Sequence, residues 1–338
     1  MLGRRYRLGG PLPRNLSGQK AAVVHSINRK ILQGIYTLES VACCICGEHD
    51  ADLLSERDRH GVRSSVVICR ACGRVRTSPR PTAQSYAQYY SEEYYGLEYG
   101  ADDPGEPFFR SQCERGRGIF EYLARAASLP PAGSRVLEVG CSSGGILSYF
   151  RDRGYAVRGV DLSEPFTQYG KRRHGLDLAV GTVGQVAAAY QPGLIIYSHT
   201  FEHVLDPDAE LAAVRALLPR TGVLYIQVPG IKYLRRGYLM DFLAYVQFAH
   251  TYHFSLTTLT NLLARNGFAL VAGDESVNAV FRQGAPAAAF VPRNDHDATV
   301  AYLKNAERLR PLHRFLTAAI RAVRRAYQRV RGVSNKEP

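Results

Sequence analysis

The chain has 338 residues, a hydrophobic content of 46% and a formal net charge of +13 at pH 7. This length allows one large or two smaller domains with a substantial core. No apolar run is long enough to span a bilayer, and the basic first residues are not followed by the apolar stretch of a signal peptide. We therefore expect a cytoplasmic protein, and its charge indicates nucleic acid, a phosphate-bearing substrate or an anionic membrane surface as partner.

Residues 41–81 contain two Cys-x2-Cys-Gly knuckles, with a spacing close to that of paired-knuckle zinc sites. Seven cysteines in a cytoplasmic chain favour metal binding or free thiols over a disulfide framework. Four thiolates complete the tetrahedral shell of a structural zinc ion and leave no open position for a substrate. We therefore predict a small zinc ribbon with the ligands Cys43, Cys46, Cys69 and Cys72.

The segments around this ribbon carry weaker patterns. Residues 1–40 are basic, and we expect an N-terminal arm there. Within the ribbon, Cys44 is a spare thiol, and His49 and His60 are the substitute ligands. Residues 82–130 are a tyrosine-rich linker followed by helical periodicity. Tyrosine combines an apolar body with a hydroxyl, so this linker suits either a cap over an active site or packing between domains.

The sequence RVLEVGCSSGG, residues 135–145, predicts a buried strand, a glycine-rich turn and the start of a helix. Its branched and bulky apolar residues are typical of a parallel strand that is covered on both faces. Its glycines allow tight turns and a close approach of a ligand to the main chain. Strand, turn and helix N-terminus together form a pocket of the nucleotide-binding type.

Two ligand classes use such a turn. A dinucleotide requires G-x-G-x-x-G, for which Gly140 and Gly145 fit the outer positions but Ser142 occupies the middle one. The pattern E-x-G-x-x-x-G is matched fully by Glu138, Gly140 and Gly144. This stretch resembles the first motif of class I S-adenosylmethionine-dependent methyltransferases, and the resemblance implies S-adenosylmethionine as the cofactor.

The following segments continue the resemblance. Residues 155–161 predict the second strand, and Asp161 ends it where an acidic residue accepts hydrogen bonds from ribose hydroxyls. The alternative role of Asp161 is a helix N-cap, together with Ser163. Residues 176–182 and 191–198 predict strands three and four. The resemblance implies the following cofactor-binding residues: Glu138, Gly140, Ser142, Gly144, Asp161, Leu162, Thr182 and Ser198.

The sequence HTFEHVLDP after the fourth strand resembles the EHv-dP signature of the same family, so that Glu202 and His203 are expected to border the pocket. Residues 222–228, 268–272 and 277–282 predict strands five to seven. Residues 131–290 are thereby expected to form an α/β domain with the Rossmann-like, seven-stranded sheet of the class I methyltransferases.

Residues 230–250 form an insertion rich in tyrosine, phenylalanine and leucine, which we expect to be a helical lid. Zinc-containing C-methyltransferases of nucleotide-linked deoxysugars resemble the sequence at its end, where His250 matches their histidine and Ala249 replaces their glutamate. The resemblance implies a base, but the carboxylate that would orient it is missing. The candidate catalytic residues are His250, His253 and His203, each with the alternative role of a hydrogen-bonded structural histidine.

Residues 291–338 form a basic C-terminal segment. Between residues 308 and 331 there are eight arginines and no acidic residue, while apolar residues recur at intervals of three and four. This pattern predicts a basic amphipathic helix, suited either to peripheral binding at the anionic inner face of a membrane or to internal packing.

From Cys43 to about Arg282 the chain resembles bacterial methyltransferases of sugar and polysaccharide pathways, in which a zinc ribbon ending in Pro-Arg-Pro and a tyrosine-rich helix precede the class I domain. The resemblance implies O- or C-methylation of a sugar, nucleotide-sugar, glycan or related small acceptor. Two alternatives are an RNA methyltransferase with a zinc ribbon, although the positive charge is concentrated in the tail, and a non-catalytic module that binds S-adenosylmethionine.

Overall fold

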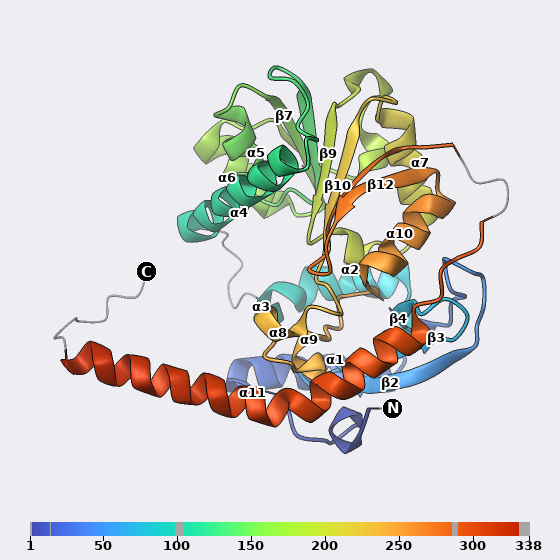
Figure 1. Cartoon of the computed structure of the whole chain (residues 1–338), viewed down its shortest axis with the longest axis vertical. Coiled ribbons are helices and arrows are strands. Elements are labelled where there is room, and N and C mark those ends of the chain that lie inside the picture. Colours follow the sequence, from blue (N-terminus) through green and yellow to red (C-terminus); the bar gives the residue numbers. More distant parts are fainter. Residues whose placement is uncertain (1, 14, 99–104, 286–289, 331–338) are drawn as a thin grey trace.

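The computed structural model describes residues 2–13, 15–98, 105–285 and 290–330 (Figure 1). Its central sheet has seven strands in the order β12-β13-β10-β9-β6-β7-β8. The pairs from β10 to β8 are parallel, whereas β13 is antiparallel to both β10 and β12. This topology confirms the predicted α/β class I methyltransferase fold. The strands are β6 (Arg135–Val139), β7 (Ala156–Asp161), β8 (Leu178–Val180), β9 (Leu194–Ser198), β10 (Val223–Gln227), β12 (Phe268–Gly273) and β13 (Asn278–Gln283).

Helices cover both faces of this sheet, which is why its central strands are apolar at almost every position (Figure 1). Successive strand residues point to opposite faces, and Ile195 and Ile196 of β9 accordingly lie in two different cores. One core includes side chains of α7 and α10, and the other includes side chains of α4 and α5. The helices are α4 (Gly105–Arg125), α5 (Gly145–Arg151), α6 (Glu164–His174), α7 (Pro207–Leu217) and α10 (Leu256–Arg265).

A second sheet of four strands, in the order β11-β4-β3-β2, forms the predicted ribbon. Its last strand, β11, comes from a distant part of the chain, because Tyr252 pairs with Arg76 and His253 with Val75. The ribbon is therefore joined to the methyltransferase domain by main-chain hydrogen bonds. Its strands are β2 (Ala51–Arg57), β3 (Arg63–Cys69), β4 (Val75–Thr77) and β11 (Tyr252–His253).

The N-terminal residues pack onto the body of the molecule. Tyr6 and Ile27 are fully buried, and Ile27 lies in a core together with the tyrosines of the linker. The linker forms two helices before α4, and the short strands β1 and β5 pair beside them. The elements are η1 (Arg4–Tyr6), α1 (Gly18–Leu32), β1 (Leu38–Glu39), β5 (Arg80–Pro81), α2 (Ala83–Glu92) and α3 (Tyr94–Glu98).

The insertion at residues 230–250 differs from the helical lid that its composition suggests. It forms only two four-residue helices, α8 (Leu234–Gly237) and α9 (Phe242–Tyr245). Its apolar side chains lie in a core together with Tyr6, ribbon residues and Leu303 of the C-terminal helix. Because the ribbon and that helix already offer an apolar surface, the insertion is buried against them.

The C-terminal segment forms one long helix, α11 (His296–Val330), as the amphipathic pattern predicts. Within the described parts of the chain, no helix combines the length and apolar character needed to cross a bilayer. Three short 3-10 turns complete the structure: η2 (Val183–Gln185), η3 (Ala188–Tyr190) and η4 (Phe201–His203).

Candidate functional site

The glycine turn after β6 has the backbone geometry that its sequence implies. Gly140 and Gly144 adopt positive φ angles of 71° and 81°, which favour glycine. A Cβ atom at Gly140 would lie 2.2 Å from Oγ1 of Thr200, so a side chain is excluded on steric grounds as well. Thr200 immediately precedes η4, so this contact brings the segment after β9 against the turn.

Asp161, at the end of β7, stabilises this turn through a hydrogen bond. One of its carboxylate oxygens accepts a hydrogen bond from the Ser142 amide at 2.7 Å, and the other accepts one from the Ser163 amide at 2.7 Å. Burial raises the pKa of Asp161. A carboxylate has about four acceptor positions, so each oxygen retains capacity for a ligand hydroxyl. The helix-cap alternative is not realised, because Ser163 is the N-cap of α6 and no side chain of the described residues caps the amides of its first turn.

Glu138 lies at the same edge of the sheet and is only 1% exposed. Its Oε2 atom makes no hydrogen bond to any residue in the described ranges. Burial, together with the nearby charge of Asp161, raises its pKa well above the usual value. A buried carboxylate oxygen without a partner is costly, so a cationic or hydrogen-bonding ligand fits this position. The amino group of S-adenosylmethionine satisfies that requirement.

The other predicted cofactor residues also follow parallel strands. Leu162, after β7, is 76% exposed, as expected of a residue that could cover an aromatic ligand. Thr182 follows β8, and its amide donates to Gln185. Ser198 ends β9, and its hydroxyl donates to Gln227 at 2.9 Å. All of these positions therefore lie at the carboxyl edge of the sheet, where open α/β sheets bind their ligands.

Three of the side chains beyond this turn form a compact cluster. Glu202 and His203 lie in η4, and His250 reaches them from the end of the insertion. Oε1 of Glu202 is 3.9 Å from Nε2 of His250 and 4.0 Å from Nε2 of His203. One ligand atom of each residue lies within 4.8 Å of the others. This set of donors suits either proton transfer or a divalent cation.

Burial determines the charge of this cluster. Glu202 is 1% exposed, and neither of its carboxylate oxygens has a hydrogen-bond partner among the described residues. Burial lowers the pKa of His203, and burial together with the nearby His203 lowers the pKa of His250 well below the usual value. Both imidazoles are therefore neutral near pH 7 and can accept a proton.

Tyrosine from the linker completes the surroundings of His203. The Tyr90 hydroxyl is 2.8 Å from Nδ1 of His203, and the Ala249 carbonyl is 3.0 Å from the same nitrogen. Tyr86 and Tyr89 instead pack against Phe248 in the core. The linker thus places Tyr90 against His203, while its neighbours Tyr86 and Tyr89 are buried in the core.

His253 is not one of the three converging side chains, although its ring centroid is 5.9 Å from that of His250. It is part of β11, and its ring packs against Tyr245 with 5.2 Å between the ring centroids. Both ring nitrogens are buried without a hydrogen-bond partner in the described structure. Burial, with a contribution from Arg74, lowers its pKa to about 3. It is buried in the core next to the ribbon and is not part of the Glu202–His203–His250 group.

The four predicted zinc ligands lie together at the end of the ribbon. Their Sγ atoms are all within 4.8 Å of one another, and three of the separations are 3.4, 3.5 and 3.6 Å. Tetrahedral zinc with Zn–S bonds of about 2.3 Å requires sulfur separations of about 3.8 Å, so the set fits the ion. Gly47 and Gly73 have positive φ angles and close the two knuckle turns.

The substitute ligands are not part of this cluster. Cys44 lies beside Tyr252 and is absent from the group of converging sulfurs. His60 instead contacts Glu98, with 3.5 Å between Nε2 and Oε1. The four ligands named from the knuckle pattern are therefore the ones that converge, and His49 does not join them.

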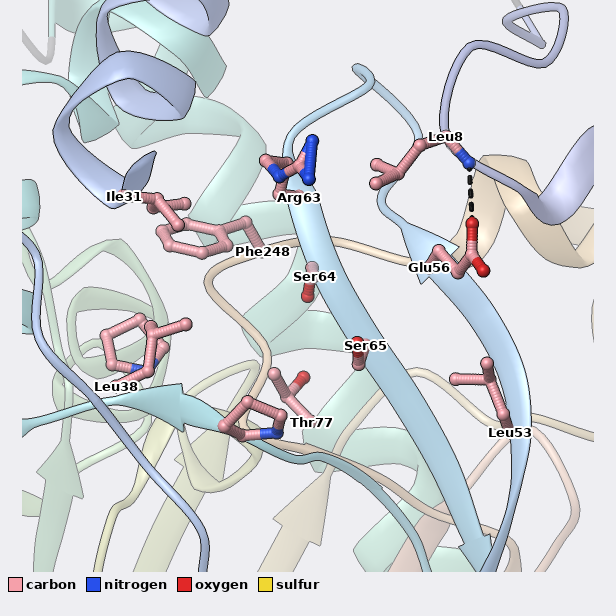
Figure 2. A pocket seen from close by; sticks show the side chains of 12 residues that line it. Leu8, Ile31, Leu38, Leu53, Glu56, Arg63, Ser64, Ser65, Thr77 and Phe248 are labelled. Atoms are coloured by element: carbon pink, nitrogen blue, oxygen red, sulfur yellow. Dashed lines mark hydrogen bonds between the residues drawn. The ribbon is translucent and has the colours of Figure 1, made fainter. Parts of the chain in front are cut away.

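A separate cavity of about 340 Å³ lies along strands β2 and β3 of the ribbon (Figure 2). Leu8, Ile31 and Phe248 line it together with serines of β3. Figure 2 shows Glu56 accepting a hydrogen bond from the Leu8 amide at the rim of this cavity, at 2.9 Å. The residues of the glycine turn and of the histidine cluster do not line it. It therefore does not belong to the candidate active site.

Sequence reasoning placed Glu202 at the border of the pocket but did not assign it a role, and it missed Tyr90 and Gln112. Gln112 accepts a hydrogen bond from the Ser143 hydroxyl at 3.0 Å and so supports the glycine turn from α4. The only signal in the sequence was the position of Glu202 beside a candidate histidine. The other two side chains are brought in by packing of helices that precede the motif.

Comparison with known proteins agrees with this geometry. Residues 110–272 match a family model described as a methyltransferase domain. Ubiquinone biosynthesis O-methyltransferase of Xanthomonas campestris pv. campestris (strain B100) is 31% identical over 161 residues, which cover 44% of this chain and 64% of that protein. C-methyltransferase NovU of Streptomyces niveus is 25% identical over 284 residues, covering 77% of this chain and 63% of NovU. The chain thus spans slightly less than two thirds of these relatives.

Among solved structures, the PH0226 protein from Pyrococcus horikoshii OT3 has a TM-score of 0.44 and 18% identity, covering 57% of this chain and 99% of that one. The 1,6-didemethyltoxoflavin-N1-methyltransferase of Burkholderia thailandensis has a TM-score of 0.43 and 15% identity, covering 66% of this chain and 96% of that one. The strand order of the sheet and the geometry of the glycine turn agree with the match of residues 110–272 to a methyltransferase domain.

Proposed function

We propose that this protein transfers a methyl group from S-adenosylmethionine to a hydroxyl oxygen or an activated carbon of a sugar, nucleotide-sugar, glycan or related small acceptor. The observation that carries the proposal is the Glu202–His203–His250 cluster, which follows directly after the contact between Thr200 and Gly140. A turn suited to the methyl donor and a buried group suited to acid–base chemistry therefore lie next to each other.

The residues at the carboxyl edge of the sheet would hold the donor. Glu138 would bind its amino group, Asp161 its ribose hydroxyls, and Leu162 and Thr182 would flank its adenine. The donor supplies an electrophilic methyl group on a sulfonium and a neutral leaving group. Attack on such a methyl group depends mainly on proximity and alignment, which the two neighbouring sites would provide.

His250 is the proposed base, with His203 beside it. Its lowered pKa keeps the imidazole neutral, so that it can take the proton of the acceptor as the new bond to the methyl carbon forms and the sulfur–methyl bond breaks. The buried Glu202 carboxylate, 3.9 Å away, would then stabilise the imidazolium. In the zinc-containing C-methyltransferases a glutamate precedes this histidine, and here Ala249 replaces it. Glu202, which lies in η4, would supply the missing carboxylate.

The acceptor class rests on two kinds of support. The relatives include an O-methyltransferase and a C-methyltransferase, so both atoms remain in the proposal. The order of ribbon, tyrosine-rich helix and methyltransferase domain supports a sugar or polysaccharide pathway. The ribbon would bind one structural zinc ion through Cys43, Cys46, Cys69 and Cys72, since their sulfurs are spaced for it.

Calorimetric titration tests the donor site first. Purified protein with its zinc content measured should bind S-adenosylmethionine and S-adenosylhomocysteine with micromolar affinity and should not bind NAD. Absence of binding to either adenosyl ligand would contradict the proposal. Transfer of labelled methyl groups to pools of nucleotide-sugars, glycans, small phenols and RNA then identifies the acceptor, and donor binding without any transfer would favour a non-catalytic module.

Two substitutions test the base. His250→Asn and Glu202→Gln should each lower kcat by about 10²- to 10⁴-fold, the usual contribution of general base catalysis, while the Kd of S-adenosylmethionine changes less than threefold. His25→Asn, at an exposed position on α1, is the matched control and should leave both quantities unchanged. Unchanged turnover in both site variants would exclude this cluster from the chemistry.

A further inference from the structure

The C-terminal helix α11 leaves the body of the molecule part-way along its length. Its 35 residues give a length of about 50 Å at 1.5 Å per residue. Leu303 and Ala306 in its first half are fully buried in the core shared with the insertion. Glu307 receives an ion pair from Arg5 at 3.0 Å. Beyond this point the helix extends past the neighbouring elements (Figure 1).

An apolar row begins where the helix leaves the body. Its five members are between 37% and 71% exposed, and they follow the three- and four-residue spacing of one helical face. At about 100° per residue, this face lies about 120° around the helix from the face of Leu303 and Ala306 that packs on the body. The exposed face therefore does not continue the internal contact. We call it the C-terminal apolar row: Leu309, Leu312, Phe315, Leu316 and Ile320.

The surroundings of this row are positively charged. Arg308 and Arg314 belong to the same stretch of the helix, and no acidic residue occurs between positions 308 and 331. The basic turn η1 lies beside the start of the exposed part, because Arg5 contacts Glu307, and Arg4 and Arg7 next to it are exposed. The surface thus combines large exposed apolar side chains with an unbalanced positive charge.

We propose that α11 binds the surface of an anionic phospholipid bilayer, lying in its plane with the C-terminal apolar row between the head groups. Apolar burial and attraction of arginine to anionic lipid both favour this arrangement. A second copy of this segment offers its arginines no acidic partner, whereas an anionic bilayer does. The catalytic domain would then be held beside the membrane.

Sedimentation with vesicles tests the proposal. The full-length protein should bind vesicles of phosphatidylglycerol and phosphatidylcholine at 50 mM salt, bind phosphatidylcholine vesicles at least tenfold less, and lose affinity as salt is raised. A row variant should bind the anionic vesicles at least tenfold more weakly. It combines four substitutions: Leu312→Gln, Phe315→Gln, Leu316→Gln and Ile320→Gln. The charge variant Arg308→Gln, Arg314→Gln should also bind about tenfold more weakly, at low salt only.

The matched control carries the same type of change elsewhere. Leu32→Gln with Val291→Gln replaces two residues that are 68% and 85% exposed but not on α11, and it should bind as the unchanged protein does. Melting temperatures establish that every variant is folded, and titration with S-adenosylmethionine should give the same Kd throughout. That titration separates failure of membrane binding from failure of the proposed methyl transfer.

Three results would overturn the proposal. The first is failure of the unchanged protein to sediment with anionic vesicles at low salt. The second is equal binding of the row variant and the unchanged protein. The third is a dimer in light scattering that only the row variant disrupts, which would show that a second copy covers this face.

Discussion

Gly140 shows at the scale of one residue how the donor pocket is specified. Its positive φ angle and the Thr200 side chain 2.2 Å from a hypothetical Cβ leave room for hydrogen only. The same contact links the cofactor turn to the segment that carries Glu202. A single glycine therefore fixes both the shape of the turn and its contact with the segment that carries Glu202.

Substitution of this glycine should separate donor binding from folding. We expect Gly140→Ala to weaken S-adenosylmethionine binding at least 100-fold, because the new methyl group must displace either the turn or Thr200. Calorimetry measures the loss. Gly118→Ala is the matched control, since a Cβ at Gly118 in α4 meets no atom within 4 Å, and it should keep full affinity. Unimpaired binding in Gly140→Ala would remove the turn from the donor site.

Because His253 is buried, the free energy of unfolding is expected to depend on pH. The pKa of His253 is lowered to about 3 in the folded protein and is about 6.5 in an unfolded chain. Between these values the unfolded state binds more protons, so the free energy of unfolding must fall as the pH falls below about 6.5. For His253 alone the expected loss at pH 5 is about 2 kcal/mol. Urea unfolding at pH 7 and pH 5 measures it.

The variant His253→Asn gives the control for this measurement. It should lose about 2 kcal/mol less stability between pH 7 and pH 5 than the unchanged protein does. An equal pH dependence in both proteins would mean that His253 is accessible to protons in the folded state.

At the scale of elements, the ribbon is a small sheet whose tip consists of the four cysteines. Cys43, Cys69 and Cys72 adjoin a large apolar core, but without the ion no bond would join the two knuckles to each other. We expect one zinc ion per chain by elemental analysis, and we expect Cys72→Ser to lose it and to lower the melting temperature by several degrees or more. Cys113→Ser, outside the cluster, should retain the zinc. Zinc-free protein of unchanged stability would contradict a structural role.

The succession of seven strands along the chain could be predicted from the sequence because apolar runs, glycine turns and acidic strand ends mark them, whereas their arrangement in the sheet was implied by the resemblance to class I methyltransferases. Strand ends were less predictable, and the third strand, expected over residues 176–182, is only Leu178–Val180. The insertion could not be predicted in the same way. Its apolar residues fit a lid or a core equally well until their partners, Tyr6 and Leu303, are known.

At the scale of the whole molecule, the ribbon holds the segment that carries the proposed base. The Thr77 hydroxyl donates to the His250 carbonyl at 3.0 Å, and the Thr77 amide donates to the Thr251 carbonyl at 3.0 Å. Asp58 accepts from the Phe248 amide at 3.2 Å. The position of His250 against Glu202 therefore depends on the ribbon as well as on the methyltransferase domain.

This coupling predicts different effects of the ribbon on binding and on turnover. We expect Thr77→Val to lower kcat about three- to tenfold, because it removes one buried hydrogen bond that positions His250. The Kd of S-adenosylmethionine should stay unchanged, since the glycine turn is not touched. Ser91→Ala in α2, at an exposed position, is the control. Parallel losses of donor affinity and turnover in Thr77→Val would indicate general destabilisation instead.

The sequence by itself determined the elements that are specified by residues close together along the chain. These are the strand–turn–helix of the donor pocket, the two cysteine knuckles and the amphipathic periodicity of the C-terminal helix. Only the tertiary structure decided which distant side chains meet. It brings Glu202 to His250, adds Tyr90 from the linker, places His253 in the core and completes the ribbon with a strand that follows His250. These contacts join residues up to about 180 positions apart, and they depend on how cores pack rather than on any local pattern.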